Sequence, residues 1–236
     1  MRRFWIWMNI IYEKCMFALF VVALLVVLYG LYDAWYVYNK ASDDSYLKYK
    51  PTAEGVPSDS PITEDMVAWL AVEDTNIDYP VMQGENNSVY LNTNPYGEYS
   101  LSGSIFLDSR NAPDFTDDYS ILYGHHMEYG KMFGSLDAFL DKEYLENHNR
   151  GKLLVGREEI KEYDLGIFAS MQVDAYGDKT LDPMSYEEAM KIIEQDASAL
   201  NSSVSKGERI VVLSTCAEPL TDKRLLVFCY IYDKAK

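Results

Sequence analysis

An uncharged apolar run near the N-terminus constrains this chain more than any other feature. Residues 15–32 read CMFALFVVALLVVLYGLY, 18 residues without a charged side chain. As an α-helix the run is about 27 Å long, close to the ~30 Å hydrocarbon core of a bilayer. Aromatic side chains gather before and after it, as expected at two membrane–water interfaces. Because the run is apolar on every face, it predicts a membrane-spanning helix rather than a core helix.

Flanking charges predict the orientation of this helix. Arg2, Arg3 and Lys14 precede it, and Asp33, Asp43 and Asp44 follow it. The positive-inside rule then places the N-terminus in the cytoplasm and the rest of the chain outside the plasma membrane. Large aromatic residues follow the run where a signal peptidase requires small ones, so a single-pass, uncleaved anchor is favoured over a cleaved signal peptide.

Composition limits the possible partners. The chain of 236 residues has a formal net charge of -16. The first 32 residues hold three basic side chains and one acidic one, so the remainder has 18 basic and 36 acidic residues and a net charge of -18. Such a surface argues against nucleic acid as a partner. With three Cys and no Cys-x-x-Cys or His-Glu-x-x-His spacing, we expect no metal and no cofactor.

The pattern divides the chain into three regions. Residues 1–38 form the cytoplasmic tail and anchor, 39–62 a polar stalk with three prolines, and 63–236 a folded domain. Short strands are expected at 66–72, 77–82, 104–108, 120–124, 152–156, 159–173, 209–215 and 224–232, and helices at 131–148 and 185–200. Many short strands with few helices predict a mainly β fold with helical insertions, either a closed barrel or a sandwich.

Two cysteines of the domain occupy different contexts. Cys216 ends the apolar strand VVLSTC and precedes a polar stretch, where a thiol could reach a substrate. The alternative for a single Cys is an inert core residue. Cys229 lies inside LLVFCYIY, which favours core packing, and a disulfide between these two cysteines is the remaining possibility outside a cell.

Candidate partners for a thiol nucleophile also lie at strand ends. His125 and His126 end the strand SILYG, and consecutive residues of an extended segment point to opposite faces, so at most one meets a given partner. Arg224 opens the last strand. A His suits proton transfer to and from a Cys nucleophile, and a guanidinium suits a developing oxyanion, although a solvated charge is the plainer interpretation of Arg224.

These residues together resemble the sortase family of membrane-anchored cysteine transpeptidases of Gram-positive bacteria. VVLSTC is similar to the family signature T-L-x-T-C, with Val212 in place of the first Thr, and Arg224 in KRLLVF and the segment YGHHMEYGKMFGSL match in order. The segments Y-G-H-x-M, M-F-G-x-L and GSIFLDSRN are similar to class B sortases. The resemblance implies a closed barrel of about eight strands and selects His125, although His126 stands where the class often has Asn.

The resemblance also implies a reaction. Cys216, His125 and Arg224 would cleave the sorting signal of a secreted surface protein at a Thr and transfer the acyl group to an amine of a peptidoglycan precursor or a pilin Lys. Positions matching the class B substrate groove are Asn87, Leu91, Tyr123, Ser214 and Thr215. Two alternatives remain: a cysteine hydrolase without transfer, and a non-catalytic binding module at the cell surface.

Overall fold

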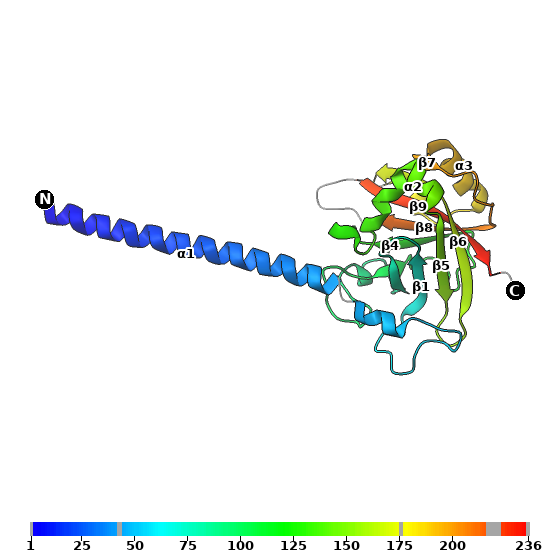
Figure 1. Cartoon of the computed structure of the whole chain (residues 1–236), viewed down its shortest axis with the longest axis horizontal. Helices are drawn as coiled ribbons and strands as arrows, with labels where there is room; N and C mark the ends of the chain where they lie inside the picture. Colours follow the sequence, from blue (N-terminus) through cyan, green and yellow to red (C-terminus); the bar gives the residue numbers. More distant parts are fainter. Residues whose placement is uncertain (1, 42–43, 175–176, 216–222, 235–236) are drawn as a thin grey trace. The chain divides into compact units, whose positions relative to one another are not determined.

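The computed structural model describes residues 2–41, 44–174, 177–215 and 223–234 (Figure 1). The chain divides into two compact units, Met1–Ser42 and Asp43–Lys236. The first unit holds one helix, α1 (Arg2–Ala41), of 40 residues. Within its candidate span Arg2–Tyr36, an 18-residue window has a mean hydropathy of 2.6, and none of that window is buried by protein. The helix is therefore long and apolar enough to cross a membrane, as the sequence predicts.

The second unit is built on one sheet. Within the described residues its strands are β1 (Met66–Val72), β2 (Asp78–Met82), β3 (Ile105–Leu107), β4 (Tyr119–Gly124), β5 (Arg150–Val155), β6 (Lys161–Asp174), β7 (Ala199–Leu200), β8 (Arg209–Thr215) and β9 (Lys223–Asp233). They pair in the order β5-β1-β2-β3-β4-β8-β9-β6-β7, and β6 also pairs with β5. That last pairing closes eight strands into a barrel, so the predicted fold is confirmed; β7 is a short addition beside β6.

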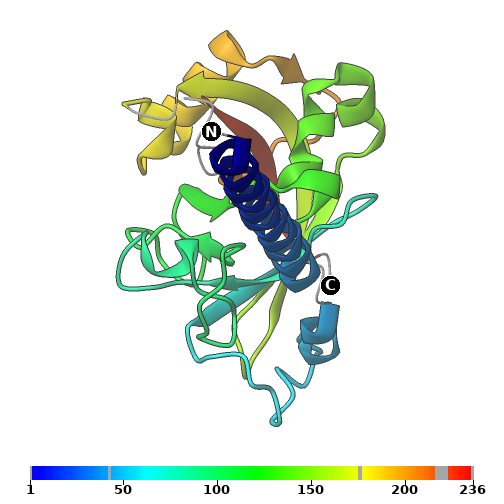
Figure 2. The same cartoon turned by 90° about the vertical axis from the view of Figure 1, so that its left-hand side faces the viewer.

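The pairing directions determine which strand ends meet. β2–β3 and β4–β8 are parallel, and the other pairs are antiparallel. The long strand β6 curves beside β9 along most of its length (Figure 2). Closure leaves the eight barrel strands without an unpaired edge, which protects the domain from edge-to-edge association.

The centre of the barrel wall is apolar on both faces. In β8, Val211, Val212 and Leu213 are each at most 1% exposed. β-Branched side chains favour the extended backbone, and the burial of consecutive residues means that both faces of the strand are covered. In the neighbouring strands the Phe168 and Tyr230 rings stack with their centroids 3.8 Å apart.

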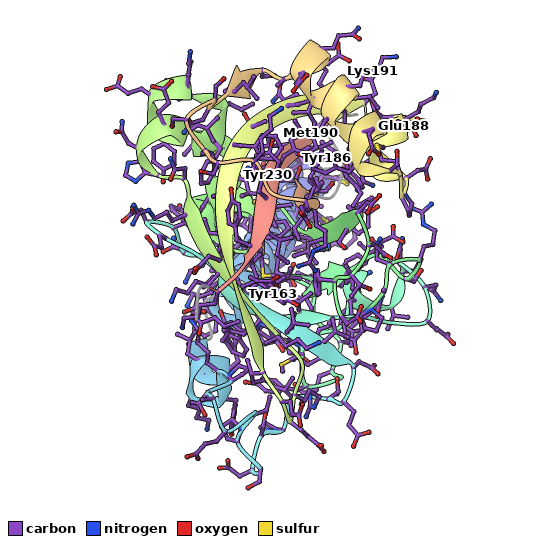
Figure 3. All side chains as sticks on the ribbon, turned by 90° about the vertical axis from the view of Figure 1, so that its right-hand side faces the viewer. Tyr163, Tyr186, Glu188, Met190, Lys191 and Tyr230 are labelled. Atoms are coloured by element: carbon purple, nitrogen blue, oxygen red, sulfur yellow. The ribbon has the colours of Figure 1, made fainter. Side chains whose placement is uncertain are left out.

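Helix α3 (Tyr186–Asp196) covers part of this wall. Ser185 caps it by accepting a hydrogen bond from the Glu188 amide, as its side chain and position favour. Met190 faces β9, where the Tyr230 hydroxyl lies 3.5 Å from its sulfur, and the two side chains lie close together in Figure 3. The helix ends at Asp196, four residues before the predicted end, because Leu200 pairs with β6 as part of β7.

The other predicted helix, 131–148, is divided in two. The structure has a 3₁₀ helix, η4 (Gly134–Leu140), followed by α2 (Lys142–Asn147). Asp141 between them is extended, with φ −80° and ψ 124°, and its carboxylate accepts a hydrogen bond from the Tyr144 amide. An Asp cap inside the apolar pattern therefore ends one helix and starts the next.

Shorter 3₁₀ helices lie between the strands: η1 (Asp44–Tyr49), η2 (Val89–Leu91), η3 (Glu128–Gly130) and η5 (Lys179–Leu181). The segment expected as a stalk includes η1, and its described residues 44–62 contact the barrel. Tyr46 and Ile62 are buried in the core, and the Lys50 ammonium lies 2.7 Å from the Asp78 carboxylate. Burial of these two apolar side chains stabilises the contact.

Candidate active site

Three strand ends meet at one edge of the barrel. β4 and β8 run parallel with Gly124 opposite Thr215, so their C-terminal ends coincide. β9 runs antiparallel to β8, with Leu226 opposite Ser214, so its N-terminal end lies at the same edge. His125 follows β4 directly, and Arg224 is the second residue of β9. The structure therefore brings two of the three predicted catalytic positions to one edge; Cys216 lies outside the described residues.

The His125 imidazole is half-buried and held by the main chain. Its Nε2 lies 2.8 Å from the Leu91 carbonyl oxygen. Because a carbonyl only accepts, this ring nitrogen carries a proton, and Nδ1 makes no hydrogen bond to any residue in the described ranges. Leu91, predicted in the substrate groove, thus lies beside His125 and contacts it through its backbone.

The neighbouring His126 has a different environment. Its Nε2 lies 2.7 Å from an oxygen of Asp137, whose side chain is 60% exposed. The two imidazoles therefore have separate partners, as alternation along an extended segment predicts. The two rings are therefore not interchangeable, and the choice of His125 for proton transfer stays a prediction.

Arg224 is half-buried and lies over an aromatic ring. Its guanidinium carbon is 5.7 Å from the centroid of the Tyr123 ring, within cation–π range. Its Nε is buried and makes no hydrogen bond to the described residues. Among the described residues, the guanidinium is therefore placed by contact with the ring, and its Nε donor stays unused.

The hydroxyl groups of Ser214 and Thr215 are used inside the barrel. Thr215 Oγ1 accepts a hydrogen bond of 2.9 Å from the Leu225 amide, which fixes the start of β9 beside the end of β8. Ser214 is fully buried, and its hydroxyl donates to the Thr215 carbonyl at 3.2 Å. Both lie at the predicted edge, and their groove role stays a prediction.

Asn87 contacts a buried carboxylate, Asp108, whose burial no sequence motif indicates. Its amide donates to the Asp108 carboxylate at 2.9 Å. Asp108 is fully buried and also receives hydrogen bonds from Arg110 and from the Tyr123 hydroxyl, at 3.1 Å. Burial alone raises the pKa of Asp108, but the bonds from Arg110 and Asn87 outweigh it and hold that pKa below its ordinary value.

Cys229 is a core residue, as predicted. It is fully buried in β9 opposite Val211, and it is a free thiol, which speaks against a disulfide at this position. Burial raises its pKa far above the ordinary value, so its thiolate is inaccessible at neutral pH.

Comparisons with known proteins agree with this architecture. The family model described as the sortase domain matches residues 70–231. The chain belongs to the sortase family. It is 38% identical over 160 residues to Sortase B of Listeria monocytogenes, covering 66% of this chain and 64% of that protein, and 32% identical over 178 residues to Sortase B of Staphylococcus aureus, covering 72% and 71%.

Solved structures give the same result for this sortase. A Streptococcus pyogenes class B sortase involved in pilus biogenesis has a TM-score of 0.66 and 39% identity, covering 72% of this chain and 94% of that one. The sequence resemblance to class B is thereby confirmed. The aligned region spans slightly less than two thirds of the Listeria relative's length.

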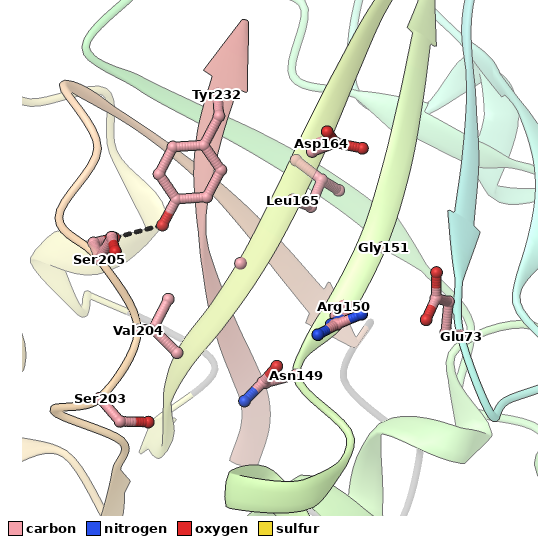
Figure 4. Close-up of a pocket in the computed structure, with 11 residues that line it drawn as sticks. Glu73, Asn149, Arg150, Gly151, Asp164, Leu165, Ser203, Val204, Ser205 and Tyr232 are labelled. Atoms are coloured by element: carbon pink, nitrogen blue, oxygen red, sulfur yellow. Dashed lines mark hydrogen bonds between the residues drawn. The ribbon is translucent and has the colours of Figure 1, made fainter. Parts of the chain in front are cut away.

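This sortase also has a polar hollow distant from the edge described above (Figure 4). The hollow has a volume of about 490 Å³ and lies between β5, β6 and the loop 203–205. Asp164 and Tyr232, which line it, are opposite each other on β6 and β9. Tyr232 is eight residues beyond Arg224 along β9, about 27 Å away. The hollow is therefore separate from the candidate active site.

Proposed function

We propose that this chain is a membrane-anchored cysteine transpeptidase of the class B type. The main support is the register of β4, β8 and β9, which brings His125, Arg224 and Thr215 to one edge of the barrel. Cys216 follows Thr215 directly in the chain. Chain connectivity supports the convergence of a thiol, an imidazole and a guanidinium at this edge.

In the proposed acylation step, the Cys216 thiolate attacks the carbonyl carbon of a Thr in a sorting signal. A C–S bond forms, and the carbonyl π electrons move to oxygen, where Arg224 donates N–H groups to the oxyanion. Its Nε, which makes no hydrogen bond to the described residues, is consistent with such a role. When the tetrahedral intermediate collapses, the C–N bond breaks and His125, as imidazolium, gives a proton to the leaving amine.

The second step transfers the acyl group. His125 removes a proton from an incoming amine, which attacks the thioester carbon and displaces the Cys216 sulfur. The bond from His125 Nε2 to the Leu91 carbonyl leaves Nδ1 as the nitrogen that exchanges these protons. The acceptor is a peptidoglycan-precursor amine or a pilin Lys; the pilus role named for the Streptococcus relative supports testing the latter.

The anchor and its orientation complete the proposal. Helix α1 carries Arg2, Arg3 and Lys14 in its N-terminal part, so its N-terminus lies in the cytoplasm and the barrel outside the plasma membrane. Single-pass anchoring by residues 15–32 would hold the barrel near secreted proteins that carry sorting signals.

The experiment uses the full chain in detergent micelles with peptides containing L-P-x-T-G or N-P-x-T-x. Mass spectrometry should detect a thioester on Cys216 with one of them, and added triglycine or Lys peptide should attack that thioester in place of water, so that a transfer product forms at the expense of the hydrolysed product. Cys216→Ala should form no thioester, whereas Cys229→Ala, a matched thiol control, should form it. An unchanged product mixture with added amine would indicate a hydrolase, and no adduct with any peptide would favour a binding module.

A further inference from the structure

A buried carboxylate lies behind the candidate active site. Asp108 follows β3 and is fully buried. Arg110 donates to it from Nε and from a terminal nitrogen, at 2.9 Å and 2.8 Å, and Asn87 donates at 2.9 Å. Arg110 in turn contacts Asp182 at 2.7 Å, which joins the cluster to the segment after η5. Hydrogen bonds from Asn87 and Arg110 therefore fix Asp108, and Arg110 connects it to Asp182.

The Tyr123 side chain extends from this carboxylate toward Arg224. Its hydroxyl donates to Asp108 at 3.1 Å, and its ring packs 5.4 Å from that of Phe106. Tyr123 is only 7% exposed. The hydroxyl proton is therefore committed to a buried charged acceptor, which fixes the direction of the side chain, and the predicted groove role of Tyr123 stays a prediction.

Strand register explains why Arg224 meets this ring. Tyr123 is opposite Ser214, and Ser214 is opposite Leu226. Arg224 is two residues before Leu226, so its side chain leaves the sheet on the same face as Tyr123. The ring is the one described partner of the guanidinium, whose Nε has no hydrogen bond to described residues.

We infer that Tyr123 is a positioning residue for Arg224: Asp108 fixes the ring through its hydroxyl, and the ring face holds the guanidinium at the barrel edge. This inference deepens the proposed function and rests on it where catalysis is concerned. A cation–π contact suits this task because it restrains the guanidinium plane without occupying its N–H groups, which stay available for an oxyanion.

The kinetic test measures single-turnover thioester formation by the full chain in detergent micelles. Tyr123→Leu should slow acylation by about 5- to 30-fold, the range of a partly desolvated cation–π contact, with the half-saturating peptide concentration unchanged. Tyr123→Phe keeps the ring, so its acylation rate should fall clearly less than that of Tyr123→Leu. In the Arg224→Ala background, Tyr123→Leu should add no further loss, because it acts through Arg224.

A matched control exists at the other end of the barrel. Arg209 lies over the Tyr163 ring at 5.2 Å, and Tyr163 is also 7% exposed. Tyr163→Leu should lower stability in a similar way but leave the acylation rate at the wild-type value. Multiplicative losses from Tyr123→Leu and Arg224→Ala, or a Tyr123→Leu effect confined to peptide affinity, would overturn the inference.

A second measurement does not depend on activity. In the full chain labelled with [¹⁵N]arginine, the Arg224 Nε–Hε resonance, assigned through Arg224→Lys, should carry an aromatic ring-current shift. Tyr123→Leu should abolish that shift, and Tyr123→Phe should keep it. An identical resonance in wild type and Tyr123→Leu would refute the positioning, whereas absence of thioester formation by wild type with every peptide would refute only the proposed function.

Discussion

Replacing Asp108 by Asn tests the buried cluster most directly. The wild-type carboxylate accepts side-chain hydrogen bonds from Arg110, Asn87 and Tyr123, together with one from the Arg110 amide. Asn has nearly the same shape but no charge, and it offers an NH₂ group where the wild type offers an acceptor. Asp108→Asn therefore leaves several donors without an adequate partner.

The structure sets the size of the effect. Removing one member of a buried ion pair costs about 3–5 kcal/mol, because the other charge stays behind. The Arg110 side chain is 47% exposed, so water can partly replace the lost carboxylate. We therefore expect the lower end, about 3 kcal/mol, which lowers the Tm by about 6–12 °C for a domain of this size.

Thermal unfolding of the full chain in detergent micelles, followed by near-UV circular dichroism at pH 7, measures this change. Asp182→Asn is the matched control, because Asp182 contacts the same Arg110 but is 67% exposed. An exposed ion pair contributes less than about 1 kcal/mol. A Tm loss in Asp108→Asn no larger than in Asp182→Asn would refute the reasoning about the buried charge.

Four further predictions follow from single contacts. Below pH 4 the difference in Tm between wild type and Asp108→Asn should narrow. The pKa of Asp108 is lowered in the folded protein, so its ionised carboxylate stabilises the fold fully above the ordinary pKa of 3.8, and this stabilisation is lost as the pH falls through the pKa of the folded state. A difference in Tm that stays constant down to pH 3 would contradict this. Thr215→Val should cost about 1–3 kcal/mol in urea unfolding by leaving the buried Leu225 amide unpaired, and an unchanged midpoint would exclude that role. Cys229 should resist iodoacetamide until urea unfolds the barrel, as peptide mapping will show; native alkylation would contradict its burial. His125→Ala should lower the acylation rate by about 10²–10⁴-fold, whereas His126→Ala should change it little, and equal losses would remove the distinction between the two rings.

Much of the barrel is predictable because its strands are strongly patterned. The apolar runs around Trp69, Val212 and Phe228 became β1, β8 and β9 with small boundary shifts. Their side chains are β-branched or aromatic, and burial reinforces that preference. The prediction of one helix over 131–148 was wrong in one respect. The apolar spacing continues through the segment, but Asp141 interrupts the helix and caps the next one.

The buried cluster around Asp108 could not be predicted from the sequence. Asp108 is one of 37 acidic residues, and nothing local distinguishes a buried carboxylate from a solvated one. Its partners Asn87 and Tyr123 come from distant segments, so only the folded barrel brings the three together. Arg110, two residues away, was the one available signal. Cys216 lies outside the described residues, so its role stays a prediction.

The parallel pairing of β4 and β8 has a consequence for how the protein matures. Gly124 and Thr215 are neighbours in space but 91 positions apart in sequence, and the long loop must close before they meet. β9 then bridges β8 and β6, so a nascent chain that lacks its last residues has an open barrel. Until β9 is added, β8 and β6 each keep an unpaired edge, and Arg224 is not held beside the ends of β4 and β8.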